Sequence, residues 1–275
     1  MPGSAVQSLR MPGRRNRFAA LLWGAYGLGI YLFLYAPLLC LSVLSFNDTI
    51  NITLPWMGFT FRWYGEAFRD RDLHKALLNS IELGIVTVTI ALPIGVAAAY
   101  AFRRHFRLRE MLFNLILVAL IAPPIIVGVA QHLSWNILNL SSSLFGSTLM
   151  GHVAYTIPFI FVLIFPSFHR FDPSIEEAAL DLGANRFEMF WTIVVPIVLP
   201  GIVASAVFAF MLSFDEFIRT FFLIGADNTL PIYLWSMLMA NVSPETNAIA
   251  TLMIVFSLTL MVIGYRLARQ DYRAE

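Results

Sequence analysis

The sequence has few charged residues and a single cysteine, and each shortage excludes a class of protein. Charged residues make up 13% of the 275 residues, whereas hydrophobic residues make up 59%. A soluble domain of this size needs a charged surface over its core, so this composition excludes an ordinary soluble fold. The single cysteine, Cys40, lies in an apolar run and cannot form a disulfide within the chain. The net charge of +1 gives no basis for nucleic acid binding.

Signatures of metal binding and of proteolysis are also missing. No two of the five histidines lie three or four residues apart, so we expect no metal site, and nothing in the sequence suggests a cofactor. A six-span intramembrane protease, the alternative from another functional class, would need a serine in a Gly-x-Ser-x-Gly setting with a histidine partner. The sequence has no such motif, and His152 has no evident serine partner. A secondary transporter would usually contain internal repeats, and none is apparent.

Long apolar runs dominate what is present. A membrane-spanning helix needs about 20 mostly apolar residues, and six segments qualify: 19–46, 77–101, 111–131, 148–166, 193–223 and 246–266. The sequence therefore predicts an all-α polytopic membrane protein with six transmembrane helices. The first run is too long for a signal peptide, so we expect it to be retained. Six prolines in these runs should bend or interrupt the helices: Pro37, Pro93, Pro123, Pro124, Pro158 and Pro200.

The distribution of basic residues predicts the orientation in the membrane. With the N-terminus in the cytoplasm, thirteen arginines flank the inner ends of the spans, and four basic residues flank the outer ends. This asymmetry places both termini inside. We therefore expect a cytoplasmic tail at 1–18, a transmembrane domain at 19–266 with a cytoplasmic loop at 167–192, and a second cytoplasmic tail at 267–275.

The cytoplasmic loop should contain two short helices separated by a glycine. Asp172 can cap the first helix, Pro173 suits its first turn, and a capping box formed by Ser174 and Glu177 would be another start. Gly183 stands where a helix would end in a left-handed turn. A second helix follows, in which one apolar face is expected from the spacing of four residues: Phe187, Phe190, Trp191 and Val194.

The same loop contains a spaced motif. Glu177-Ala178-Ala179 is followed by Gly183 and then, after nine residues, by Ile193-Val194-Val195-Pro196. This resembles the EAA loop, E-A-A-x3-G-x9-I-x-L-P, of the membrane subunits of ABC importers. Only Val195 departs from the pattern, where leucine is usual. A plain amphipathic interfacial loop is the simpler alternative, but it does not explain the spacing.

The EAA resemblance implies that this loop contacts a cytoplasmic ATPase. We expect that role for six residues of its first helix and turn: Glu176, Glu177, Ala178, Ala179, Asp181 and Gly183. In such importers two permease subunits form the pore, an ATPase dimer binds inside and hydrolyses ATP, and a periplasmic binding protein delivers the solute. The chain itself is then a transport subunit of a bacterial inner membrane and not an enzyme.

Glu82 lies inside the second predicted span, and Asp215, Glu216 and Arg219 lie inside the fifth. Charges in lipid are costly, so such residues usually face a partner or an aqueous path. Arg219 lies four residues after Asp215 and three after Glu216, so it can pair with either acid. Counting 1.5 Å per residue places Glu82 and Asp215 each about 10 Å inside the outer ends of their spans. We expect all four residues to line the translocation path, and a structural ion pair is the alternative.

Several further segments resemble the spermidine/putrescine branch of these permeases. They are Tyr35-Ala36-Pro37, Leu44-Ser45-Phe46-Asn47, Gly58-Phe59-Thr60, Trp63-Tyr64, Ser213-Phe214-Asp215-Glu216, Leu230-Pro231-Ile232-Tyr233 and Ser243-Pro244. The resemblance implies a polyamine such as spermidine or putrescine as the cargo, with another small solute as the alternative. One position departs from the branch: members often have an acid after the proline of the third span, whereas Pro124 follows Pro123 here. Whether the second permease is a copy or a paralogue stays open.

Overall fold

The computed structural model describes residues 14–49, 55–240 and 243–270, and within these ranges the protein is all-helical. The helices are α1 (Arg14–Leu44), α2 (Arg62–Ala67), α3 (Arg71–Ala101), α4 (Arg109–Ile121), α5 (Pro124–Ile137), α6 (Leu149–Arg170), α7 (Pro173–Asp181), α8 (Arg186–Met189), α9 (Val195–Phe214), α10 (Ile218–Leu223), α11 (Leu230–Ala240) and α12 (Pro244–Gln270). Two π-helical turns, η1 (Leu144–Thr148) and η2 (Phe190–Val194), lead into α6 and α9. Residues 1–13 and 271–275 of the predicted tails lie outside the described residues.

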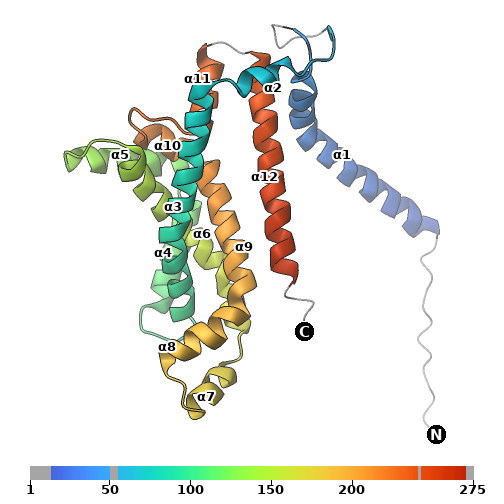
Figure 1. Cartoon of the computed structure of the whole chain (residues 1–275). Helices are drawn as coiled ribbons and strands as arrows, with labels where there is room; N and C mark the ends of the chain where they lie inside the picture. Colours follow the sequence, from blue (N-terminus) through green and yellow to red (C-terminus); the bar gives the residue numbers. More distant parts are fainter. Residues whose placement is uncertain (1–13, 50–54, 241–242, 271–275) are drawn as a thin grey trace.

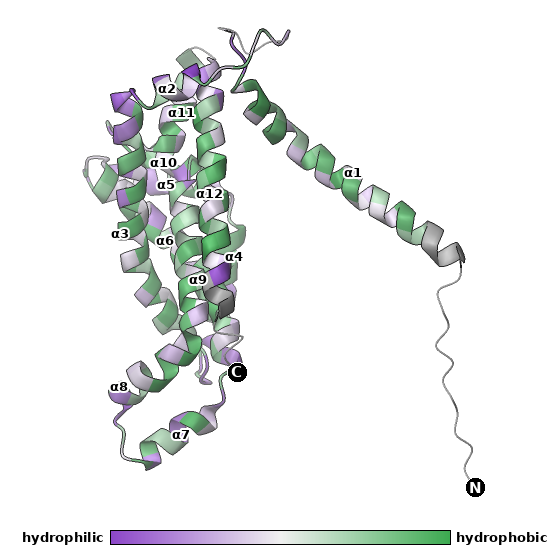
Figure 2. Cartoon of the chain, turned by 45° about the vertical axis from the view of Figure 1, so that its right-hand side comes forward, coloured by the Kyte–Doolittle hydropathy of each residue, from purple (hydrophilic) through white to green (hydrophobic). Residues whose placement is uncertain are grey.

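The long helices form an elongated bundle. In Figure 1, α3, α4, α6, α9 and α12 run along its length, α2 and α11 lie at one end, and α7 and α8 lie at the other. Helix α1 contacts α12 but diverges from the bundle along most of its length. None of the most apolar window of α1 is buried, whereas half of the corresponding window of η1 and α6 is buried. The polar residues gather mainly at the two ends of the molecule, which suits a bundle embedded in lipid (Figure 2).

Helices α3, α6 and α9 form the core. Close approach of α3 to α6 depends on Gly95, where a Cβ atom would lie 2.5 Å from the side chain of Ile160. Phe161 and Ile164 of α6 are fully buried beside this contact. Since lipid tails are as apolar as these side chains, tight packing at small residues supplies the association energy.

Among the described residues, five helices are long and apolar enough to cross a membrane, and α4 with α5 makes a sixth crossing if the bent pair counts as one. The predicted span at 111–131 is interrupted where Pro123 and Pro124 were expected to bend or break it, and α4 and α5 meet there at an angle of 102°. Ala122 and Pro123 are extended, with ψ angles of 131° and 124°. A residue before proline avoids the helical conformation, and the Pro123-Pro124 pair imposes this twice. Pro124 then begins α5, where its missing N–H costs nothing.

The remaining prolines of the expected set do not end their helices. Pro37, Pro93, Pro158 and Pro200 lie inside α1, α3, α6 and α9. The fifth segment, expected as one helix over 193–223, instead ends at Phe214 and resumes as α10. Its acidic residues therefore lie in a break between helices.

Segments that resemble the polyamine branch meet at the α2 end of the bundle. The indole N–H of Trp63 donates to the backbone carbonyl of Asn47 at 2.9 Å, and Asn47 forms a backbone bridge with Phe59. The hydroxyls of Ser45 and Tyr64 are 2.7 Å apart. These contacts hold the connection from α1 onto α2.

Candidate functional site

The predicted loop at 167–192 folds as a short helix, a glycine turn and a second short helix. The carboxylate of Asp172 accepts the backbone N–H of Ser174 at 2.9 Å, which makes Asp172 the cap of α7. After Asp181 the backbone N–H groups of Gly183 and Ala184 donate to Leu180 and Ala179, and Gly183 has a φ of +94°. This pair of bonds is a Schellman motif, which ends a helix at a left-handed residue. The prediction of a helix ended by Gly183 is confirmed.

The candidate coupling residues divide between the surface and the core. Four are exposed: Glu177, Ala178, Asp181 and Gly183. Ala179 is buried in the cluster that contains Phe168 and Met189. Glu176 turns toward the end of α3, where it forms an ion pair with Arg103. The exposed face of α7 is therefore open to a partner protein, and the opposite face anchors it to the bundle.

The spacing in the second short helix predicted a single apolar face, and this prediction is wrong. Phe190 packs against the core cluster and Val194 is fully buried, whereas the side chains of Phe187 and Trp191 are 75% and 54% exposed. The π-helical turn η2 begins at Phe190 and shifts the register of the side chains that follow. With the 89% exposed Leu182, Phe187 and Trp191 leave an apolar surface beside α7.

The acids at the end of α9 have different partners. Glu216 accepts the backbone N–H of Arg219 at 2.9 Å and the Arg219 guanidinium at 3.0 Å. Its carboxylate thus caps α10 and neutralises the arginine. Asp215 stands at the end of α9, is exposed, and lies near Ser257 of α12. From the sequence, Arg219 could pair with either acid, and in the structure it forms its ion pair with Glu216.

Arg219 is deeply enclosed. Its side chain is 3% exposed, that of Glu216 is 9% exposed, and the guanidinium carbon lies 3.7 Å from the ring centre of Tyr155. A buried ion pair is strongly destabilised when one partner is removed, by roughly 3–5 kcal/mol, because the other charge then lacks compensation. Glu216 and Arg219 therefore have a structural role at the break between α9 and α10.

A buried histidine that sequence reasoning left without a partner supports the same break. His152 is fully buried, with Nδ1 2.7 Å from Ser213 Oγ and Nε2 2.8 Å from Thr220 Oγ1. The Thr220 hydroxyl in turn donates to the carbonyl of Glu216 at 2.7 Å. The expectation that His152 lacks a serine partner is therefore wrong. Both ring nitrogens are engaged by hydroxyls inside the core, which is the arrangement of a structural bridge between α6, α9 and α10.

Glu82 lies on α3, one residue after Ile81, which lines the same cavity as Phe214 of α9. It is exposed on α3, next to the fully buried Leu83. Helix α3 begins at Arg71, so Glu82 is about 16 Å along it, whereas Asp215 lies at the end of α9. Among the described residues no hydrogen bond or ion pair joins Glu82 to Asp215.

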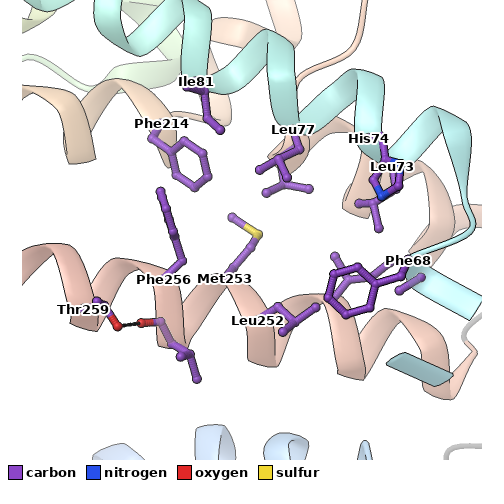
Figure 3. Close-up of a pocket in the computed structure, with 14 residues that line it drawn as sticks. Phe68, Leu73, His74, Leu77, Ile81, Phe214, Leu252, Met253, Phe256 and Thr259 are labelled. Carbon is purple, nitrogen blue, oxygen red and sulfur yellow. Dashed lines mark hydrogen bonds between the residues drawn. The ribbon is translucent and has the colours of Figure 1, made fainter. Parts of the chain in front are cut away.

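An apolar cavity lies between α3 and α12. It has a volume of about 440 Å³, and its lining includes Leu77, Phe214, Met253 and Phe256 (Figure 3). Among the described residues that line it, His74 is the one titratable side chain and none is a carboxylate. A charged solute would lose its hydration there without compensation, so this cavity suits an apolar group. Within the ranges covered by the structure, no cluster of three or more histidine, cysteine or acidic side chains could hold a metal ion.

Comparison with known proteins places these features in a family. Residues 91–270 match the model of the binding-protein-dependent transport system inner membrane component. The chain is 32% identical over 251 residues to the spermidine/putrescine transport system permease protein PotC of Escherichia coli (strain K12), covering 90% of this chain and 94% of the relative. It is 31% identical to the putrescine transport system permease protein PotI of the same organism, covering 88% of this chain and 89% of the relative.

Solved structures show the same fold. A bacterial ABC transporter involved in the import of the acidic polysaccharide alginate matches with a TM-score of 0.69 at 22% identity, covering 94% of this chain and 98% of that chain. The MetNI methionine ABC transporter matches with a TM-score of 0.59 at 18% identity, covering 77% and 99%. The chain therefore belongs to the family of binding-protein-dependent transport system inner membrane components, which are the transport subunits of ABC importers and leave ATP hydrolysis to a separate subunit.

Proposed function

We propose that this protein is a permease subunit that imports a polyamine, spermidine or putrescine, across a bacterial inner membrane. The observation that carries the proposal is the similarity, over nine-tenths of the chain, to a permease named for spermidine and putrescine. The second candidate, another small solute within the same family, is favoured by the Pro123-Pro124 pair, where polyamine members often have an acid.

The proposed assembly contains a second permease subunit, a cytoplasmic ATPase dimer and a periplasmic binding protein that delivers the cargo. Both termini and α7 lie in the cytoplasm. The exposed face of α7, with Glu177, Ala178 and Asp181, contacts the ATPase, and the turn at Gly183 sets the direction of that face. The glycine turn and the exposed apolar side chains beside it support this role.

The proposed path for the cation includes Asp215. A cation leaving water needs a compensating charge, and binding must stay weak enough for release. Asp215 is exposed and forms no ion pair among the described residues, so its charge is available. Glu216 and Arg219 act beside the path by holding the break that presents Asp215. Glu82, also exposed, belongs to the proposed path as a second acid.

The two acids offer a matched pair of variants. We expect Asp215→Asn to lower uptake of labelled spermidine or putrescine while membrane abundance and basal ATP hydrolysis stay unchanged. We expect Glu216→Gln to lower abundance or thermal stability, because Arg219 would lose its buried partner, a loss of roughly 3–5 kcal/mol. Uptake by cells and immunoblots of their membranes separate the two effects.

Wild-type uptake of both polyamines by Asp215→Asn, at normal abundance, would remove Asp215 from the path. Polyamine import is a separate claim, tested on the unmodified transporter. If the assembled transporter imports neither spermidine nor putrescine while its own binding protein stimulates ATP hydrolysis, the cargo is another solute.

A further inference from the structure

Helix α7 has two adjacent acids that face in different directions. Glu177 is exposed on the outer surface. The side chain of Glu176 is 14% exposed and forms an ion pair with Arg103, whose side chain is 11% exposed. Arg103 follows the last turn of α3, 73 positions earlier in the chain. One acid is thus free for a partner protein, and the other binds the bundle.

Arg103 contacts three elements at once. Its guanidinium lies 4.8 Å from the ring centre of Phe171, which follows α6, and 5.3 Å from that of Tyr100 in α3. The Tyr100 hydroxyl lies 3.4 Å from the same Glu176 oxygen that pairs with Arg103. Arg103 therefore joins the ends of α3 and α6 to α7, and stacking on two aromatic rings restricts its guanidinium.

Helix α7 has few other attachments. It is nine residues long, and a helix this short is not stable without tertiary contacts. Ala179 is its one buried residue, and an alanine supplies little area to fix the rotation of a helix. The charge pair, set at a defined point on α3, constrains that rotation more strongly because its geometry is directional.

We propose that Arg103 is a positioning residue that ties α7 to α3, so that displacement of α7 by an ATPase is passed to the central helix of the bundle. This inference rests on the proposed contact between α7 and the ATPase. Arg103 touches neither the cargo nor ATP in this account. Its effect is on coupling, measured as the amount of cargo imported for each ATP hydrolysed.

The test uses the complete transporter in proteoliposomes, with its ATPase, second permease and binding protein. Labelled spermidine uptake and ATP hydrolysis are measured together. We expect Arg103→Gln to lower the uptake-to-hydrolysis ratio about tenfold, the size of effect expected when a partly buried charge pair is broken. The matched control is Arg104→Gln, because Arg104 is the next residue, is exposed, and has no ion pair in the part of the chain that the structure describes. Its ratio should stay at the wild-type value.

A charge exchange separates coupling from folding. Glu176→Arg alone should lower the ratio as Arg103→Gln does, and the double variant Arg103→Glu with Glu176→Arg should recover most of the loss. Arg103→Lys should recover part of it, because the charge remains while the stacking is weakened. Membrane abundance is measured for each variant. If a single variant is less abundant, recovery of the uptake-to-hydrolysis ratio in the double variant decides whether the charge pair acts in coupling.

A wild-type ratio for Arg103→Gln, or single and double variants whose effects simply add, would overturn the inference.

Failure of the polyamine assignment would look different. The unmodified transporter would then show no spermidine uptake, and the Arg103 variants would be scored on ATP hydrolysis stimulated by the binding protein. If Arg103→Gln and Arg104→Gln respond alike in that assay, Arg103 does not position α7.

Discussion

Gly183 shows how one backbone conformation can set the direction of a whole surface. Its φ of +94° is strained for any residue with a side chain, although a Cβ there would meet no heavy atom within 4 Å. A substitution therefore acts on the turn itself and not on its neighbours. A left-handed conformation costs roughly 1–2 kcal/mol for an L-residue, and more for a β-branched one.

We predict that Gly183→Val abolishes uptake while the subunit still inserts, because α7 can no longer end in the Schellman turn. Gly183→Asn should keep most activity, since asparagine tolerates the left-handed region. Uptake at equal membrane abundance compares the two. Wild-type uptake and hydrolysis in Gly183→Val would show that this turn is not part of the transmission.

The stability of the start of α7 depends on pH through the carboxyl group of Asp172. The backbone N–H of Ser174 donates to its carboxylate, and this bond lowers the pKa of Asp172. A carboxyl group with a lowered folded-state pKa stabilises the fold above its unfolded pKa of about 4, and this contribution is lost as pH falls through the folded value. The cap is therefore complete at neutral pH.

We predict that the α7 amides are protected from hydrogen exchange at neutral pH and lose part of that protection in acid. Asp172→Asn keeps an acceptor oxygen without titrating, so its protection should not depend on pH through this position. Asp172→Ala should exchange faster at every pH. Mass spectrometry of α7 peptides, corrected for the intrinsic exchange rate, measures this. Equal protection in Asp172→Ala and the parent protein would exclude the cap as a source of helix stability.

At the scale of elements, the break between α9 and α10 is the feature on which the acids depend. His152 bridges Ser213 on one side of the break and Thr220 on the other. Deleting one partner of such a buried bond costs roughly 1–3 kcal/mol, because the remaining polar groups stay unsatisfied.

We predict that His152→Leu lowers the thermal unfolding midpoint of the assembled transporter. The exposed His105 gives a matched control, since His105→Leu removes the same ring from a loop and should leave the midpoint nearly unchanged. An unchanged midpoint for His152→Leu would mean that the break is held without this bridge.

The elements that could be predicted from the sequence are those fixed by local signals. The lengths of the apolar runs predicted the spans. Asp172, Pro173 and Gly183 predicted the two ends of α7. The end of α9 was missed because the residues up to Leu223 continue the apolar run, and the capping of α10 by Glu216 depends on a buried site. The Arg103–Glu176 and His152–Ser213 contacts span 73 and 61 positions, and no local pattern encodes such pairs.

At the scale of the whole molecule, the distribution of arginines sets the predicted orientation in the membrane. The arginine asymmetry predicts that α7 and both termini face the cytoplasm. Cysteines introduced at Asn185 and Asn228, after replacement of Cys40, should react with impermeant reagents from opposite sides, and both positions are exposed. Labelling of both from the periplasm would reverse the orientation and remove α7 from reach of an ATPase.

The contact between α1 and α12 has a consequence for biosynthesis. These helices touch, yet about 200 residues separate Leu44 from Pro244. At translation rates of about 5–20 residues per second, the ribosome needs roughly 10–40 s to cover that distance. Helix α1 must therefore remain stable in the bilayer by its own hydrophobicity while the rest of the bundle is made. None of its most apolar window is buried in the bundle, so α1 can insert before α12 has been synthesised.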